Sequence, residues 1–510
     1  MLHMQTAARP RALLLNGVLM STCFAGLEGC IIVTINLSAA IVPPEVAATS
    51  NGVLYLCFSL MAFAAPPIVE RLSAKWCMIS SMALYSLYLA SFILANPTML
   101  LVSAAVGGCA GSLLWVAQGV YFTRNALAYD VACAAGGGTF PCSFLGGDSI
   151  TAFAGLFAIC FQLVTTLAKP TAAVLLTIYP NDRTTLFGIL TAAAISCTLL
   201  MLLILPLRDE PRHDDLAATA AATAAAGAPT AASAQQPPPP SPSFMSPPSP
   251  PPSEPPMLLR PTSAVDSGSG RGCQRCLSDR NSNLLLLLLD PRALLLTPYN
   301  AAFGVATSFF PTHITVLTNE IFDRPGESGA AAVGWMYTIA GATSAVIAAT
   351  AAVGAQRFRW ARPITMLLGS AAFVAASLLS ALGGREEGPG CPCFTYAVLG
   401  GMYVCYGVGV AAWQGSCMAM VGDLFRDDPR AAFAHLKFTS GICSFVGFFV
   451  LPKLSLRRAA LVTAGTSACG ALGLVALLAM QEQLQERSLR TTAAPIVHAR
   501  SIAVQEGSAD

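Results

Sequence analysis

The chain has 510 residues, of which 55% are hydrophobic and 11% are charged. Soluble domains carry about 25% charged residues, so this composition excludes a soluble globular protein and indicates an integral membrane protein. The formal net charge is +2 and no basic face is visible, which argues against nucleic acid as a partner.

Twelve apolar runs are long enough to cross a membrane, since a spanning helix needs roughly 20 residues. We predict spans near 13–35, 51–70, 76–95, 99–123, 149–176, 184–207, 292–318, 329–353, 363–383, 394–421, 431–451 and 458–480. Six fall within residues 1–207 and six within residues 284–480, so we expect an all-α membrane protein made of two six-helix halves. Residues 481–510 are polar and are interpreted as a cytosolic tail.

The first span contains a carboxylate, Glu28. A charge in hydrocarbon costs on the order of 3 kcal/mol or more unless it faces a cavity or a partner. Two interpretations are open: a proton or cation site that faces a pore, or a neutral, hydrogen-bonded or interfacial carboxyl group.

A glycosylation sequon, Asn36-Leu37-Ser38, follows in the same run. It has an allowed middle residue, and it would be external if the N-terminus is cytosolic. The sequence therefore predicts Asn36 as a candidate attachment site for a glycan.

The stretch Gly107–Thr123 of the fourth span combines small, aromatic and amide residues. The pairs Gly107–Gly111 and Gly108–Ser112 have the spacing that lets a neighbouring helix approach closely. Its second half carries Trp115, Gln118, Tyr121 and Phe122. An amide in hydrocarbon needs a partner or a water-lined cavity, so we expect this helix to face a polar interior.

A similar stretch, Gly407–Phe425, occurs in the second half of the chain, where Trp413 is followed by Gln414 and Gly415. Two copies in two halves indicate a duplicated membrane protein.

The fifth span contains a second amide, Gln162, which we expect to meet Gln118. The seventh span is interrupted by helix-breaking and polar residues, as in transporter helices beside a binding site. These residues are Pro298, Tyr299, Asn300, Gly304, Pro311 and His313. His313 is either a titrating group in a cavity or a histidine near the outer membrane interface.

Residues 208–283 are rich in Ala, Pro and Ser and cannot bury a core. We predict a disordered cytosolic linker with polyproline II character between the halves. An inert tether and a ligand for an SH3 or WW domain are both open. A lone CxxC motif, Cys273 to Cys276, lacks the second pair that a zinc site requires.

Basic residues in short loops predict the orientation. With a cytosolic N-terminus, the cytosolic loops contain Arg71, Lys75, Arg124, Arg357, Arg359, Arg362, Arg426 and Arg430. The external loops contain Arg183, Arg324 and Arg385, together with a dissenting group formed by Lys453, Arg457 and Arg458. The balance favours cytosolic termini.

Five stretches of the chain resemble the Unc-ninety-three-type family, the ion-channel-regulatory branch of the major facilitator superfamily. They are SNGVLYLCFSLMAFAAPPIVERLSAKW, LLWVAQGVYFT, FAGLFAICFQL, DPRALLLTP and LFRDDPRAAFAHLKF. The turn Glu70–Lys75 departs from the superfamily pattern, because Ser73 stands where glycine is usual. The resemblance implies a major-facilitator-like fold and a regulatory or accessory subunit of potassium channels, or an escort of other membrane proteins.

The alternative function is a secondary transporter of an ion or small solute with a midplane site. The candidate cavity-lining residues are Glu28, Trp115, Gln118, Tyr121, Gln162, Asn300, His313, Trp413 and Gln414. Ion-coupled carriers use several membrane-embedded charges, whereas Glu28 is the one carboxylate that we place well inside a span, so the regulatory function is favoured. No catalytic, metal-ligand or phosphate-loop pattern is present, so we expect neither an enzyme nor a cofactor. The plasma membrane and internal membranes are both open as its location.

Overall fold

The computed structural model describes residues 10–136, 149–180, 182–207, 289–323, 328–383, 392–425 and 429–506. Twelve helical segments in these ranges are long and apolar enough to cross a membrane, which confirms the predicted spans. The predicted linker lies outside the described residues.

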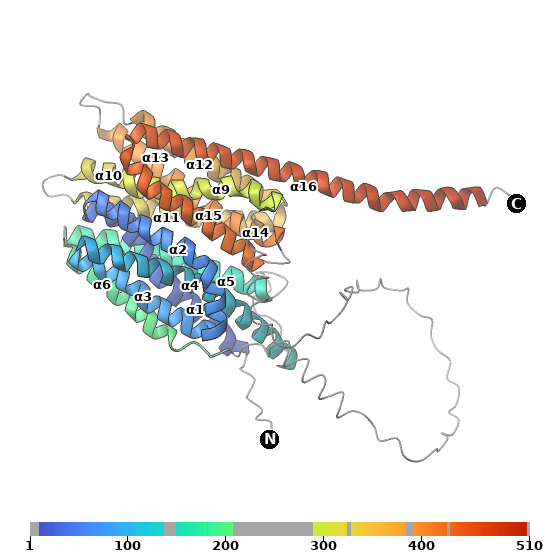
Figure 1. The fold of residues 1–510 in the computed structure, drawn as a ribbon, viewed down its shortest axis with the longest axis horizontal. Coiled ribbons are helices and arrows are strands. Elements are labelled where there is room, and N and C mark those ends of the chain that lie inside the picture. The colour runs from blue at the N-terminus through green and yellow to red at the C-terminus, as the bar shows by residue number, and fades with distance from the viewer. Residues whose placement is uncertain are drawn as a thin grey trace, which may run out of the picture. The chain divides into compact units, whose positions relative to one another are not determined.

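The first half consists of six helices. They are α1 (Pro10–Ile41), α2 (Pro44–Leu72), α3 (Ala74–Leu94), α4 (Pro97–Gly136), α5 (Ser149–Ile178) and α6 (Arg183–Met201). Figure 1 shows them in blue to green.

The second half, in yellow to red, also has six spans. They are α9 (Pro291–Phe309) continued by η2 (Phe310–Ile314) and α10 (Thr315–Phe322), α11 (Gly329–Arg357), α12 (Ala361–Gly383), α13 (Pro392–Ala411) continued by η3 (Ala412–Cys417) and α14 (Met418–Leu424), α15 (Pro429–Val450) ending in η4 (Leu451–Lys453), and α16 (Leu456–Glu506). The segments η2 and η3 are π-helical turns. Pro311 lies in η2, which is the predicted interruption of the seventh span, because proline cannot donate the helical hydrogen bond.

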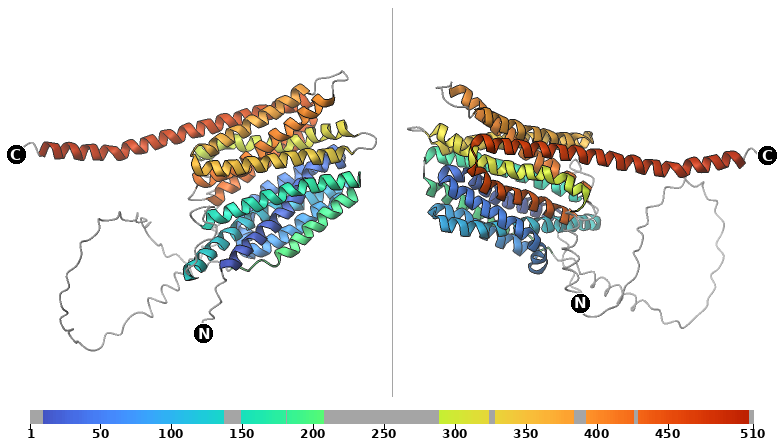
Figure 2. Two further views of the ribbon diagram at one scale, coloured as in Figure 1. Left: turned by 180° about the vertical axis from the view of Figure 1, so that it is seen from behind. Right: turned by 45° about the horizontal axis from the view of Figure 1, so that its top comes forward.

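The last helix extends beyond the predicted span 458–480. Helix α16 continues to Glu506, through the residues interpreted as a cytosolic tail, and Figure 2 shows it leaving the bundle as one helix.

The halves pack through two helix pairs, α2 against α15 and α5 against α11. At the end where α1 finishes, α1 also contacts η2, α10 and α11. The halves are therefore closed against each other at that end, which is external under the predicted orientation.

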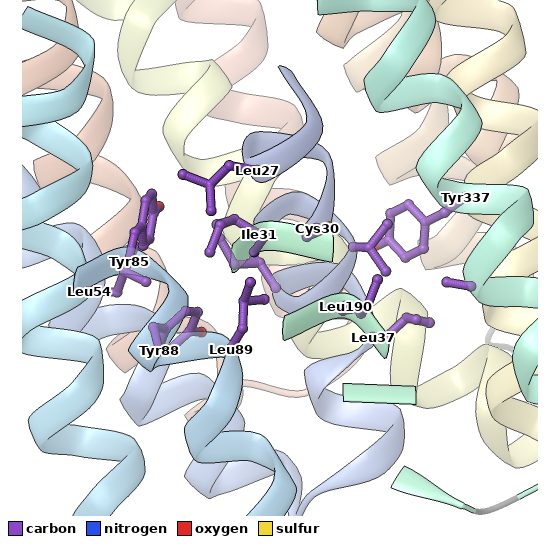
Figure 3. Close-up of a cluster of buried hydrophobic side chains, with 14 of the residues drawn as sticks. Leu27, Cys30, Ile31, Leu37, Leu54, Tyr85, Tyr88, Leu89, Leu190 and Tyr337 are labelled. Carbon is purple, nitrogen blue, oxygen red and sulfur yellow. The ribbon is translucent and has the colours of Figure 1, made fainter. Parts of the chain in front are cut away.

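Helix α1 is the centre of the first half. Figure 3 shows Leu27 and Ile31 of α1 on the side of Tyr85 and Leu89 of α3. All four side chains are almost completely buried. Glu28 lies on the buried side of α1, so its carboxyl group must find its polar partners within the protein.

Small residues permit the closest helix contacts, as their spacing predicted. A Cβ atom on Gly108 would collide with the backbone oxygen of Leu54 in α2, and one on Gly407 would collide with that of Ala340 in α11. The two copies of the repeated stretch therefore make the same kind of contact in the two halves, with no room for a side chain.

Ser73, between α2 and α3, has a backbone φ of 68° and ψ of 141°, which side-chain-bearing residues rarely adopt. Such a conformation costs of order 1 to 3 kcal/mol.

We expect Ser73→Gly to raise the free energy of unfolding by about 1 kcal/mol, because glycine adopts this conformation without strain. The thermal unfolding midpoint in detergent measures the change. Ser80→Gly within α3 is the control and should lower the midpoint, and a lower midpoint for both variants would contradict strain at Ser73.

Candidate functional site

A lysine of α15 lies between two tryptophan rings that belong to different halves. The Nζ atom of Lys437 is 4.1 Å from the ring centroid of Trp115 in α4 and 4.9 Å from that of Trp413 in η3. Both distances are within the range of a cation–π interaction. The Lys437 ammonium therefore joins the two halves by contacting an aromatic face in each.

Glu28 faces this cation. Its side chain is 5% exposed, and its Oε1 atom has no hydrogen-bond partner among the described residues. The carboxyl group accepts a hydrogen bond from the indole N–H of Trp115 and interacts electrostatically with Lys437, without a direct ion pair. Glu28 therefore lies at the interface between the halves. We call Trp115, Trp413 and Glu28 the tryptophan cage.

Other side chains fix the positions of the two tryptophan rings. The ring of Trp413 stacks on Phe303 with centroids 3.9 Å apart and 1° between the planes, and its Nε1–H donates to Oδ1 of Asn300 at 3.2 Å. The ring of Trp115 packs edge-to-face on Phe24 at 4.8 Å. Neither ring can turn without breaking these contacts, so the cage is preorganised.

The structure brings four predicted residues into or beside the cage: Glu28, Trp115, Asn300 and Trp413. Three others are occupied elsewhere. Gln162 donates to Thr166 of its own helix and to Ser344 of α11, so the expected pair with Gln118 does not form. The Nε2 atom of His313 is 2.9 Å from the carbonyl oxygen of Leu451.

Tyr121 is the third of these, and it belongs to a polar network between α1, α4 and the segment that follows α6. Its hydroxyl donates to the carbonyl oxygen of Leu205 at 2.7 Å and accepts from Asn16, which also donates to Asn125. These groups satisfy one another, so Tyr121 is a structural residue of the first half and does not line the cage. Gln118 is buried and Gln414 is half-buried, and the described residues show no hydrogen bond to either side chain.

We expect Tyr121→Phe to lower the free energy of unfolding by about 1 kcal/mol, because the Leu205 carbonyl loses its side-chain donor. The thermal midpoint of the purified protein measures this. Tyr85→Phe is the matched control, since the part of the chain that the structure describes shows no hydrogen bond of the Tyr85 hydroxyl, and it should leave the midpoint unchanged. Equal losses in the two variants would contradict a specific role for the Asn16 network.

Asn36 requires a correction. It lies inside α1 rather than in a loop, its side chain is 7% exposed, and it lines a small cavity with Lys169 and Tyr337. A glycan is attached to exposed asparagines in loops, so the structure contradicts Asn36 as an attachment site.

Sequence reasoning missed two basic residues. Lys437 lies within the predicted span 431–451 and Lys169 within the predicted span 149–176, and neither is among the predicted site residues. A lysine inside an apolar run is itself a signal of a functional group, because it needs a polar surrounding. The sequence therefore contains the signal, but it does not show which side chains surround each lysine.

Polar contacts at the opposite end of the bundle hold helices within each half. Lys75 donates to the carbonyl oxygens of Leu202 and Ile204, at 3.0 and 2.6 Å. Arg362 of α12 pairs with Asp423 of α14, and Arg292 of α9 donates to the carbonyl oxygen of Leu424 in α14 at 3.0 Å. Arg292 also pairs with Asp290, the residue that caps its own helix, at 2.9 Å. The Arg292 guanidinium holds the pKa of the Asp290 carboxyl below its ordinary value, so this contact is retained at neutral pH.

The comparisons with known proteins identify a family and a fold. A family model described as "Ion channel regulatory protein UNC-93" matches residues 47–382, which is more than half of the chain. No curated protein sequence matches. Among solved structures, the nucleoside transporter NupG, as its D323A mutant, has 12% identity and a TM-score of 0.59, covering 91% of this chain and 99% of that one.

A bacterial homologue of the human drug peptide transporters PepT1 and PepT2 has 11% identity and a TM-score of 0.57, covering 94% of this chain and 100% of that one. At such identities these likenesses show the fold alone. The predicted major-facilitator-like fold, with twelve helices in two halves, is confirmed.

Proposed function

Because the chain belongs to the UNC-93 family of ion channel regulatory proteins, we propose that it is a regulatory or accessory subunit of an ion channel in its membrane. The observation that carries this proposal is the family match over residues 47–382, which includes α4 with Trp115 and begins after α1, the helix that carries Glu28. A potassium channel is the first partner to test. An escort that brings another membrane protein to its location is a variant of the same function.

The test is co-expression with a panel of potassium channels under voltage clamp. We expect the current amplitude or its voltage dependence to change for at least one channel, while the chain alone produces no current. Surface labelling of the channel separates an escort, which alters channel abundance, from a subunit that alters gating. If every channel keeps its current and its abundance in the presence of well-expressed protein, the proposal fails.

Transport of an ion or small solute is a second candidate function, and the buried charges favour it. Glu28 and Lys437 lie between the halves, and Lys169 of α5 lines a cavity with residues of α1 and α11. Charged groups at this position line the substrate and ion pathways of alternating-access carriers. From the sequence we place one charged group, the Glu28 carboxylate, well inside a span, whereas the structure also places the two lysines inside the bundle.

Uptake into liposomes that contain the purified chain tests this second candidate. A carrier is expected to accumulate at least one ion or small solute from a panel, and to lose that uptake in Glu28→Gln. Gly119→Val is the control, because a Cβ atom at Gly119 meets nothing within 4 Å. Uptake of no solute by folded protein would leave channel regulation as the supported function.

We further propose that both termini are cytosolic. The basic turn with Arg71 and Lys75 and the turn with Arg357 and Arg362 join helices at equivalent ends of the two halves, and basic short loops stay in the cytosol. Epitope tags at either terminus are expected to be stained only after the membrane is permeabilised. Staining of intact cells would reverse the orientation.

A further inference from the structure

The tryptophan cage has the composition of a site for an organic cation. Two indole faces lie on either side of one ammonium group, and the Glu28 carboxylate with its unpartnered oxygen faces the same group. Aromatic faces combined with a negative charge are how proteins recognise alkylammonium ligands. The group that occupies the cage is part of the chain itself.

The occupant of the cage is the Lys437 ammonium group, which is attached to α15 through its side-chain methylene groups. Lys437 reaches the rings from α15, and its four-carbon stem is flexible, so the ammonium can leave while its helix stays in place. The walls, in contrast, are fixed by Phe24, Phe303 and Asn300. A rigid site with a flexible occupant can exchange that occupant for another cation of similar size.

We propose that the tryptophan cage is a binding site for a small organic ammonium ion, and that Lys437 is a tethered occupant which the ligand displaces. The inference does not depend on the proposed channel regulation, because it concerns binding alone. The ligand class follows from the occupant: an alkylammonium ion with an apolar part no larger than a few carbons.

The tether makes the affinity of the wild-type protein low. A group attached by a short flexible linker competes at an effective concentration in the millimolar range. Lys437→Ala removes the atoms Cγ, Cδ, Cε and Nζ, which together correspond to n-propylammonium. This variant leaves the cage with the space and the negative charge for that ion, and without the competitor.

The experiment measures binding of n-propylammonium and of radiolabelled tetramethylammonium to the purified full chain in detergent. We expect Lys437→Ala to bind at least about tenfold more tightly than the wild type, from the removal of the tethered competitor. Neutral n-propanol, which has the same shape without the charge, should not compete. Lys169→Ala is the matched control, since it opens an equal space where no tryptophan ring is in contact, and it should bind as the wild type does.

Equal affinities of Lys437→Ala and the wild type, or equal competition by n-propanol, would overturn the proposal. If Lys437→Ala does not fold, binding of millimolar tetramethylammonium to the wild-type protein is the test. Saturable tetramethylammonium binding that Trp413→Leu abolishes supports the site, and its absence overturns it. These readouts are independent of channel currents, so failure here and failure of the proposed function are distinguishable.

Discussion

Gly108→Val should destabilise the first half by about 3 kcal/mol and lower the amount of folded protein in the membrane. A Cβ atom at this position would collide with the backbone oxygen of Leu54, and it would lie 3.0 Å from Cβ of Cys57. Backbone atoms of a packed helix cannot move aside as a side-chain end can, so α4 must separate from α2 along its length. The thermal midpoint and the yield of monodisperse protein in detergent measure the effect.

Gly119→Val is the matched control on the same helix, because a Cβ atom there meets nothing within 4 Å. It makes the same change in helix propensity and should be close to neutral. Gly407→Val tests the second half, where the corresponding collision is with the backbone oxygen of Ala340. Similar midpoints for Gly108→Val and Gly119→Val would show that the close contact between α2 and α4 does not limit stability.

Glu28→Leu is expected to cost about 3 kcal/mol, because it leaves the Lys437 ammonium in the membrane interior without its anionic neighbour. Glu28→Gln keeps the shape and the hydrogen-bonding capacity and should fall between the wild type and Glu28→Leu. The double variant Glu28→Leu with Lys437→Leu removes both charges. It should recover part of the loss, since two apolar residues need no polar partner.

A double-mutant cycle on the thermal midpoint measures this coupling between Glu28 and Lys437. If the effects of the two single substitutions simply add in the double variant, the two groups do not interact, and the electrostatic link between the halves is excluded.

The spans and the small-residue contacts were predictable from the sequence by itself. Membrane thickness sets the length of an apolar run, and every backbone group must be satisfied within the helix, so these patterns are local. The spacing of Gly107, Gly108 and Gly111 is local in the same way. It predicted close approach, and α2 and α3 are the helices that approach.

Only the tertiary structure decided the site. Glu28, Trp115, Trp413 and Lys437 belong to four spans in two halves, and their meeting depends on how α1, α4, η3 and α15 pack. The same dependence explains the errors. The sequon at Asn36 is a three-residue pattern, but whether the asparagine is exposed is set by the helices around α1, and they bury it. Gln162 likewise found Ser344 of the opposite half instead of Gln118. Local chemistry determines which residues can cross a membrane, whereas contacts between distant helices determine which of their polar groups meet, because each such group takes the partner that packing brings within reach.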